Sequence, residues 1–482
     1  MSHERAAPRL IQGGMGVAVS DWRLARTVAQ MGEMGVVSGT AIGTVCARRL
    51  QDGDPHGDLR RALEAFPDQA VAGRIIDRYL LPGGRPAGRP YRAVPVPRQH
   101  PVRQFDEMTV AGAFVEVFLA KEGHDGNVGI NFLEKIQMPT LPSLYGAILA
   151  GVDYVLMGAG IPIHIPGAIA SLAEHRLTEI PLSVVGATAE DHFTLSFDPR
   201  SVVKDPGPAL VAPRFIAIVS SHVLASHLAR SEEARPWGFV VEAPIAGGHN
   251  APPRGRLMLD AAGEPIYGPR DRVDMEQMRA IGLPFYLAGG YADPAKLRQA
   301  LAEGASGVQI GSAFALCEES GLEPELKRRA REEVAAGRLR PYTDAVGSPT
   351  GFPFKVGRLE GTIADPDGKV HRSRRCDLGY LVTTYRREDG SVGYRCPSEP
   401  DEDFLRKGGR PEDLTGRICL CNGLVSSAGL AQYRLDEGGL EPMLLTLGDD
   451  VCRVLKVLSP DGAPYHAADV VRYVLGEGTA PA

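Results

Sequence analysis

The 482-residue sequence lacks any run of about 18 apolar residues, so no membrane-spanning helix is expected. Its N-terminal residues, MSHERAAPRL, lack the apolar stretch of a secretory signal, and the number of cysteines, seven, is odd. These features together predict a reducing, cytoplasmic location and no membrane partner. Lysine and arginine form no basic stripe and the formal net charge is −6, which argues against nucleic acid as a partner.

Paired C-x₂-C motifs, which are typical of zinc ribbons, are also missing. Four cysteines nevertheless gather in the last quarter of the chain: Cys376, Cys396, Cys419 and Cys421. Four thiolates can bind zinc or an iron–sulfur cluster, but this spacing favours reduced structural thiols or one substrate-facing cysteine. We therefore predict no metal site and leave the role of these cysteines open.

The sequence does contain eight short apolar runs, each ending in glycine or a small polar residue. They are residues 10–14, 35–39, 127–132, 152–158, 215–221, 237–242, 284–290 and 307–311. Helical patterns lie between them, and strands that alternate with helices indicate a parallel sheet. Because eight is the number of strands that closes a barrel, we predict an α/β fold, a (β/α)₈ TIM barrel, over an open doubly wound sheet.

Two stretches interrupt this rhythm. Residues 43–125 form a long insertion with a Pro/Gly/Arg-rich part, 81–101, and residues 181–203 suggest a hairpin on the barrel rim. The barrel pattern ends near residue 322. We assign residues 1–322 to the barrel and residues 323–482 to a C-terminal extension packed on it, which begins with a charged helix at 323–336.

The last two strands end in glycine turns. LAGGY places Gly289 and Gly290 after the seventh strand, and GVQIGSAF places Gly311 and Ser312 after the eighth, where a helix is expected to begin. Loops after strands seven and eight are the usual phosphate site of such barrels, and backbone N–H groups there attract an anion. Two tight turns without a ligand are the alternative, but two such turns one β/α step apart favour a phosphate.

The first strand ends in Gln12, Gly13, Gly14 and Met15. A loop with so little side chain can lie against a flat flavin ring, with Gln12 bonding the ring edge. Asn131, at the end of the third strand, is a candidate for the same edge or for the ribityl chain. A plain glycine turn and a structural asparagine are the alternatives.

His249 follows Gly247 and Gly248 after the sixth strand, in VVEAPIAGGHN. Its position predicts an imidazole at the barrel mouth. Histidine titrates near neutral pH, so it is suited to proton transfer, although a histidine in a loop is often only polar surface.

The motifs QGGM, NVGINF, AGGH, LAGGY and GVQIGSAF, in this order, resemble those of the nitronate monooxygenase (2-nitropropane dioxygenase) family. That family is similar to FMN-dependent enoyl reductases, including those acting in trans with polyketide synthases. The resemblance covers roughly residues 8–320 and implies non-covalent FMN with His249 as the catalytic residue. The cofactor-binding residues that we expect are Gln12, Gly13, Gly14, Met15, Asn131, Gly247, Gly248, Gly289, Gly290, Gln309, Gly311 and Ser312.

One departure concerns the substrate. The family commonly has an acidic residue a few positions before Gly-Gly-His, whereas Ile245 and Ala246 stand there in this chain and the nearest acid is Glu242. We therefore expect a different substrate pocket. The leading hypothesis is an FMN-dependent monooxygenase that oxidises a nitronate or a similar acidic carbanion with O₂.

The alternative is an NAD(P)H-dependent enoyl reductase that acts in trans on an acyl carrier protein. No G-x-G-x-x-G fingerprint follows a strand, but barrel flavoenzymes stack nicotinamide on the flavin without one. A non-catalytic flavin-binding subunit is a third reading, which the intact His249 disfavours. The expected ligand is a small molecule, and the sequence is compatible with a homodimer.

Overall fold

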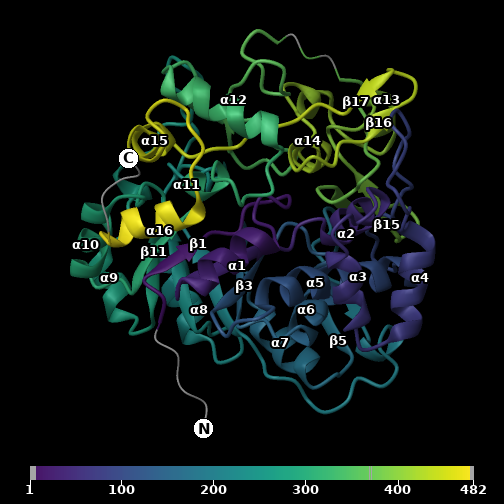
Figure 1. Cartoon of the computed structure of the whole chain (residues 1–482). Helices are drawn as coiled ribbons and strands as arrows, with labels where there is room; N and C mark the ends of the chain where they lie inside the picture. Colours follow the sequence, from purple (N-terminus) through teal and green to yellow (C-terminus); the bar gives the residue numbers. More distant parts are fainter. Residues whose placement is uncertain (1–6, 369, 371, 478–482) are drawn as a thin grey trace.

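The computed structural model describes residues 7–368, 370 and 372–477. Eight parallel strands form a closed barrel in which each pairs with the next barrel strand along the chain and β11 closes onto β1 (Figure 1). They are β1 (Leu10–Gln12), β2 (Met34–Ser38), β3 (Val128–Leu133), β4 (Tyr154–Gly158), β7 (Arg214–Val219), β8 (Gly238–Glu242), β10 (Phe285–Ala288) and β11 (Gly307–Ile310). The predicted (β/α)₈ barrel is confirmed, and each apolar run supplies one strand.

Side chains along each strand point alternately into the barrel and outward toward the helices. Side chains such as Ile11, Leu156, Val240 and Tyr286 fill the barrel interior, and their sequence neighbours pack outward against helices. The helices between the strands include α1 (Trp22–Gln30), α6 (Thr140–Leu149), α7 (Ile165–Ala173), α8 (His222–Arg230), α9 (Met275–Ala280), α10 (Pro294–Ala302) and α11 (Ser312–Ala315). The barrel is thus a filled core, and its chemistry belongs at the carboxyl ends of the strands.

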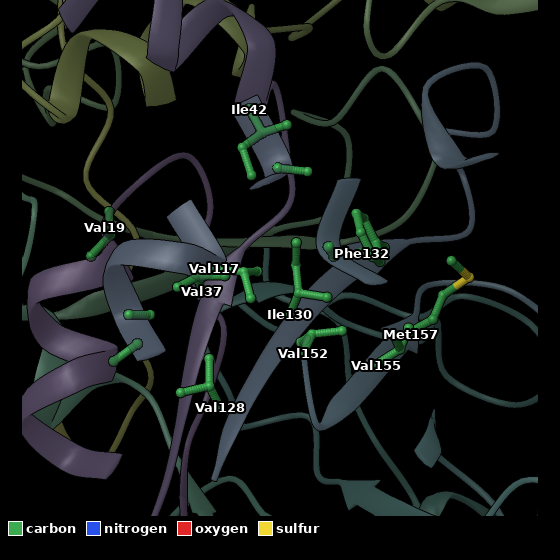
Figure 2. Packing of buried hydrophobic residues seen from close by; sticks show 14 of the residues in the cluster. Val19, Val37, Ile42, Val117, Val128, Ile130, Phe132, Val152, Val155 and Met157 are labelled. Atoms are coloured by element: carbon green, nitrogen blue, oxygen red, sulfur yellow. The ribbon is translucent and has the colours of Figure 1, made fainter. Parts of the chain in front are cut away.

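The insertion at 43–125 is largely helical. It holds most of α2 (Ile42–Gln51) and all of α3 (Asp58–Glu64), α4 (Gln69–Tyr79) and α5 (Arg103–Lys121), whereas residues 81–101 form neither helix nor strand. Helix α5 is buried along most of its length because it lies between α2 and α6 and against the barrel. Figure 2 shows Val117 of α5 beside Val37 and Ile130, which come from neighbouring strands.

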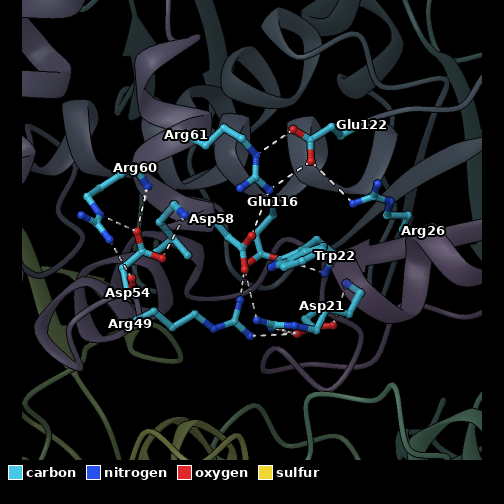
Figure 3. A network of polar contacts seen from close by, with 12 residues as sticks. Asp21, Trp22, Arg26, Arg49, Asp54, Asp58, Arg60, Arg61, Glu116 and Glu122 are labelled. Atoms are coloured by element: carbon cyan, nitrogen blue, oxygen red, sulfur yellow. Dashed lines mark hydrogen bonds and ion pairs between the residues drawn. The ribbon is translucent and has the colours of Figure 1, made fainter. Parts of the chain in front are cut away.

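Buried charges join the helices α1, α2 and α5. Asp21 caps the start of α1, and Arg49 of α2 pairs with both Asp21 and Glu116 of α5 (Figure 3). Glu116 also accepts a hydrogen bond from the backbone N–H of Trp22 at 3.0 Å. Each buried charge has a partner of opposite sign, which offsets the free energy lost when it leaves water.

An antiparallel hairpin of β5 (Thr178–Pro181) and β6 (Thr194–Phe197) packs against α6 and α7 and begins slightly earlier than the sequence suggested. Residues between its strands reach the C-terminal extension, where Val185 forms a bridge with Tyr385. The hairpin and the extension are therefore in direct contact.

The extension covers one end of the barrel. Its elements are α12 (Pro324–Ala335), β12 (Pro341–Asp344), β13 (Phe354–Gly357), β14 (Thr383–Arg386), β15 (Val392–Arg395), α13 (Asp401–Arg406), α14 (Leu420–Ser427), β16 (Tyr433–Arg434), β17 (Gly439–Leu440), α15 (Val451–Leu458) and α16 (Ala467–Leu475). Helix α16 packs on α1 and α10, and β13 pairs with the short strand β9 (Gly248–His249) that follows β8. Within the described residues, no helix is long and apolar enough to cross a membrane.

Candidate active site

A cavity of about 220 Å³ opens at the carboxyl ends of the barrel strands. Twelve of the thirteen site residues expected from sequence line it: Gly13, Gly14, Met15, Asn131, Gly247, Gly248, His249, Gly289, Gly290, Gln309, Gly311 and Ser312. These residues come from distant parts of the chain, and closure of the barrel brings them together. The position of the cavity is the one where barrels hold ligands.

Gln12 is the exception, because it does not line this cavity. Its side chain is fully buried, with Oε1 accepting from the backbone N–H of Val36 at 3.0 Å and Nε2 donating to Ser20 Oγ at 2.8 Å. Nε2 also donates to the carbonyl of Gly13. Gln12 therefore holds the loop after β1 in place, and its polar atoms are already occupied by the protein.

The glycine loop after β1 packs closely on two polar side chains. A Cβ atom at Gly14 would lie 2.2 Å from Cβ of Asn131, and one at Gly13 would lie 3.2 Å from the side chain of Gln309. Only glycine leaves room for this approach at Gly14. Gln309 lies on β11, and its Oε1 is buried with no hydrogen-bond partner among the described residues. An unpaired buried acceptor in a cavity wall fits a ligand that donates a hydrogen bond.

The end of the cavity where we expect a phosphate to bind lies beside the extension. Gly289 and Gly290 have φ angles of +88° and +80°, a conformation that favours glycine. Ser312 begins α11, which is a single short turn, and its Oγ accepts from the backbone N–H of Gly448 at 2.6 Å. No lysine or arginine is among the described residues that line the cavity, so an anion there would depend on backbone N–H groups.

The extension also brings a carboxyl to this end. Asp450 lines the cavity, and burial raises its pKa. A raised pKa favours the uncharged form, which reduces repulsion of a nearby anion. Sequence reasoning missed Asp450, because nothing near it in the sequence indicates a position at the barrel mouth.

His249 is held by the extension. It lies opposite Phe354 in the β9–β13 pair, and the two rings meet edge to face with centroids 4.8 Å apart. Its Nε2 lies 2.8 Å from Oγ of Ser348, within hydrogen-bond distance. Burial lowers the pKa of His249 to about 4, so the imidazole is neutral near pH 7.

Glu242, the last residue of β8, faces the same space. Burial raises the pKa of its carboxyl to about 7. In the sequence, Glu242 stands out only as the nearest acid before His249. Its position at the end of an apolar barrel strand was the available signal, since polar residues at such ends are commonly functional.

A second chamber of about 230 Å³ adjoins the first, and both are lined by Glu242, His249, Ala159 and Ile218. Asn250 belongs to its wall: the amide nitrogen bonds the carbonyl of Ala246, and Oδ1 is buried without a partner among the described residues. Two titratable side chains therefore stand where two chambers meet, which is a suitable place for proton transfer between bound groups.

The roof of the first chamber comes from the extension and includes Phe354, Leu381, Leu424 and Leu444. The side chain of Lys355, the neighbour of Phe354, is only 3% exposed and pairs with Asp449. Its charge is used within the extension. Among the described residues, no group of three or more His, Cys, Asp or Glu side chains is arranged to hold a metal ion.

Comparison with known proteins finds a family model that is similar to a central segment of the chain. Residues 206–338 match the family model described as nitronate monooxygenase. A probable nitronate monooxygenase of Bacillus subtilis (strain 168) is 38% identical over 93 residues, which are 19% of this chain and 25% of that protein. A (3aS,4S,5R,7aS)-5-hydroxy-7a-methyl-1-oxo-octahydro-1H-indene-4-carboxyl-CoA dehydrogenase of Mycobacterium tuberculosis (strain ATCC 25618 / H37Rv) is 31% identical over 242 residues, 48% of this chain and 55% of that protein. The chain thus spans from a quarter to about half the length of these relatives.

Two solved structures are similar at low identity. FabK from Thermotoga maritima is 16% identical and nitroalkane oxidase from Streptomyces ansochromogenes is 14% identical, each with a TM-score of 0.46. The alignments cover 98% of this chain in both cases, 93% of the first and 96% of the second. The barrel assignment rests on the strand pairing. The resemblance to the nitronate monooxygenase family is confirmed over residues 206–338, the segment that matches the family model and carries His249 and the glycine turns after β10 and β11.

Proposed function

We propose that this protein is an FMN-dependent oxidoreductase. The observation that carries the proposal is the juxtaposition of His249 and Glu242 between two chambers at the mouth of a glycine-lined barrel. The unpaired Oε1 of Gln309 and the close contact of Gly14 with Asn131 fit a flat ligand with hydrogen-bond donors on its edge. FMN, when bound, would supply the redox chemistry.

The expected phosphate site fits FMN without a cation. Gly289, Gly290 and Gly311 would offer backbone N–H groups, and the hydroxyl of Ser312 can donate one hydrogen bond while it accepts another. The raised pKa of Asp450 is compatible with an anion at this end.

The leading activity is oxidation of a nitronate or a similar acidic carbanion, with O₂ as co-substrate. A nitronate has already lost its proton, so it places no demand on a base. For a neutral nitroalkane, His249 would accept the proton from the carbon that bears nitrogen, because its ring is neutral near pH 7. Ser348 would orient that ring through its bond to Nε2.

Enoyl reduction with NAD(P)H is the second candidate, and Glu242 is the observation that favours it. With a pKa near 7, a good fraction of this carboxyl is protonated at neutral pH, so it can donate a proton to the α-carbon of an enoyl thioester. The second chamber beside it provides room for an acyl chain. An acyl carrier protein would be the partner that delivers such a chain.

Anaerobic stopped-flow on FMN-loaded protein separates the candidates. Loss of flavin absorbance on mixing with propyl-2-nitronate, but not with NADPH, supports the first. Loss with NADPH, followed by recovery on adding a crotonyl thioester, supports the second. A protein that takes up no FMN from solution would overturn both.

A further inference from the structure

The second chamber contains one cationic side chain, Arg254. No other lysine or arginine is among the described residues that line either chamber. Glu242 and His249 line both chambers, and apolar side chains such as Ile218 and Leu224 form part of the wall of the second. This chamber therefore combines a positive charge, an apolar surface and the two groups that we place at the chemistry, a composition that suits an organic anion.

The guanidinium of Arg254 is held by backbone groups from two separate segments. Nη1 donates to the carbonyl of Arg270 at 2.6 Å, and Nη2 donates to the carbonyl of Ser220, just after β7, at 3.0 Å. A guanidinium has five N–H groups, so three of them remain without a partner among the described residues. The two carbonyls fix the position of the cation and leave its charge uncompensated.

Two acids are among the described residues of this wall, and neither forms an ion pair with Arg254. The oxygens of Asp271 accept from the backbone N–H groups of Arg254 at 2.8 Å and of Gly268 at 2.7 Å, so this carboxylate shapes the loop. Burial raises the pKa of Glu242 to about 7, so a good fraction of this carboxyl is uncharged near neutral pH. Repulsion of a bound anion is reduced accordingly.

A second polar group in the wall also lacks a partner. Asn250 is 2% exposed, and its Nδ2 donates to the carbonyl of Ala246 at 3.0 Å. Its Oδ1 has no hydrogen-bond partner among the described residues. A buried acceptor without a donor lowers stability, so it indicates a ligand that donates a hydrogen bond. This observation is independent of Arg254, and both favour a polar ligand in the second chamber.

We propose that the second chamber binds an organic oxyanion and that Arg254 is the residue that selects it. The oxyanion bonds the three free N–H groups of Arg254, and an apolar chain lies along Ile218 and Leu224 toward Glu242 and His249. The binding site rests on the chamber itself, whereas the assignment of the reacting end rests on the proposed function. The oxyanion is a carboxylate of the substrate or a phosphate of a nucleotide-linked thioester, since a guanidinium binds both through the same planar donors.

Isothermal titration calorimetry on the full chain, before and after addition of FMN, tests the proposal. The probes are hexanoate, its neutral analogue hexanamide, and coenzyme A. Hexanoate or coenzyme A should bind at least about tenfold more tightly than hexanamide, because a hydrogen bond between charged groups contributes more than a neutral one. Tight binding of hexanoate assigns the oxyanion to the substrate, and tight binding of coenzyme A alone assigns it to a thioester carrier. If neither anion binds more tightly than hexanamide, the proposal is wrong.

Variants locate the site. Arg254→Gln should reduce binding of the preferred anion to the level of hexanamide, and Arg254→Lys should retain part of the preference because it keeps the charge. Arg256→Gln is the matched control, since Arg256 is exposed on the same loop and does not line the chamber, and it should retain the full preference. Equal losses in Arg254→Gln and Arg256→Gln would overturn the proposal, as would full binding by Arg254→Gln.

The test also separates this site from the proposed function. Calorimetry needs neither turnover nor flavin, so a protein that takes up no FMN would overturn the proposed function and leave the measurement of anion binding intact. Thermal unfolding of each variant shows whether it is folded. If Arg254→Gln is not folded, Arg254→Lys takes its place, and unchanged anion binding by that variant would contradict a role for the planar guanidinium.

Discussion

Nε2 of His249 lies 2.8 Å from Oγ of Ser348, a residue that is 99 positions later in the chain and belongs to the extension. Phe354, six residues after Ser348, packs its ring against the same imidazole. The extension therefore sets the orientation of the side chain that we place at the centre of the chemistry. Removal of the Ser348 hydroxyl is a direct measure of that dependence.

Ser348→Ala should lower kcat by about fivefold, because one hydrogen bond of about 1 kcal/mol then no longer holds the imidazole in place. FMN affinity should change little, since Ser348 does not line the first chamber. Flavin titration and steady-state kinetics measure both quantities. An unchanged kcat would mean that the ring is held by Phe354 alone.

His249→Ala should slow oxidation of a neutral nitroalkane by about 10²–10⁴-fold, the usual range for loss of a positioned base. Oxidation of the corresponding nitronate should stay within a few-fold, because that substrate has already lost its proton. His56→Ala, at an exposed position, is the matched control and should leave both rates unchanged. Equal losses on both substrates would contradict a role in proton abstraction.

The pH dependence of stability should reveal Glu242. Its pKa, about 7 in the folded protein, lies above the ordinary value of 4.5, so the folded state holds a proton that the unfolded state has lost. This group therefore removes stability as the pH rises from about 4.5 to about 7. His249, with its pKa lowered to about 4, acts in the opposite direction between about 4 and 6.5, because the unfolded state binds the extra proton there.

Glu242→Gln should consequently gain stability relative to the unmodified protein as the pH is raised from 5 to 8. Urea unfolding at both pH values gives the difference. Glu179→Gln, on the exposed side of β5, is the control and should show no such trend. A stability difference that is the same at both pH values would mean that the carboxyl is ionised throughout.

Gly14→Ala should weaken FMN binding by more than about tenfold and destabilise the barrel by about 1–3 kcal/mol, because the new Cβ would lie 2.2 Å from Cβ of Asn131. Gly167→Ala, in α7, is the matched control: a Cβ there meets nothing within 4 Å, and alanine stabilises a helix by up to about 1 kcal/mol relative to glycine. Equilibrium dialysis with FMN and thermal unfolding provide the measurements. Normal FMN binding by Gly14→Ala would show that the loop can move away from Asn131.

The sequence alone determined the barrel and the position of its glycine turns. Continuous apolar runs such as 237–242 and turn glycines such as Gly289 reflect local burial and local backbone conformation, which short segments encode by themselves. It also placed Asn131 and His249 at strand ends, which parallel closure brings to one mouth. The helices within 43–125 were not anticipated, because α5 is buried on most sides and lacks a clear apolar stripe.

Only the tertiary structure decided what surrounds these residues. The partners of His249, the burial of Glu242 and the roof over the first chamber all depend on chain segments far apart in sequence. The role of Gln12 was also not predictable from local sequence. Its amide bonds Val36 and Ser20 in the folded protein and is therefore not available to a ligand. Such contacts form only when distant segments of the chain pack together. Local sequence patterns therefore do not predict which side chains will be in contact.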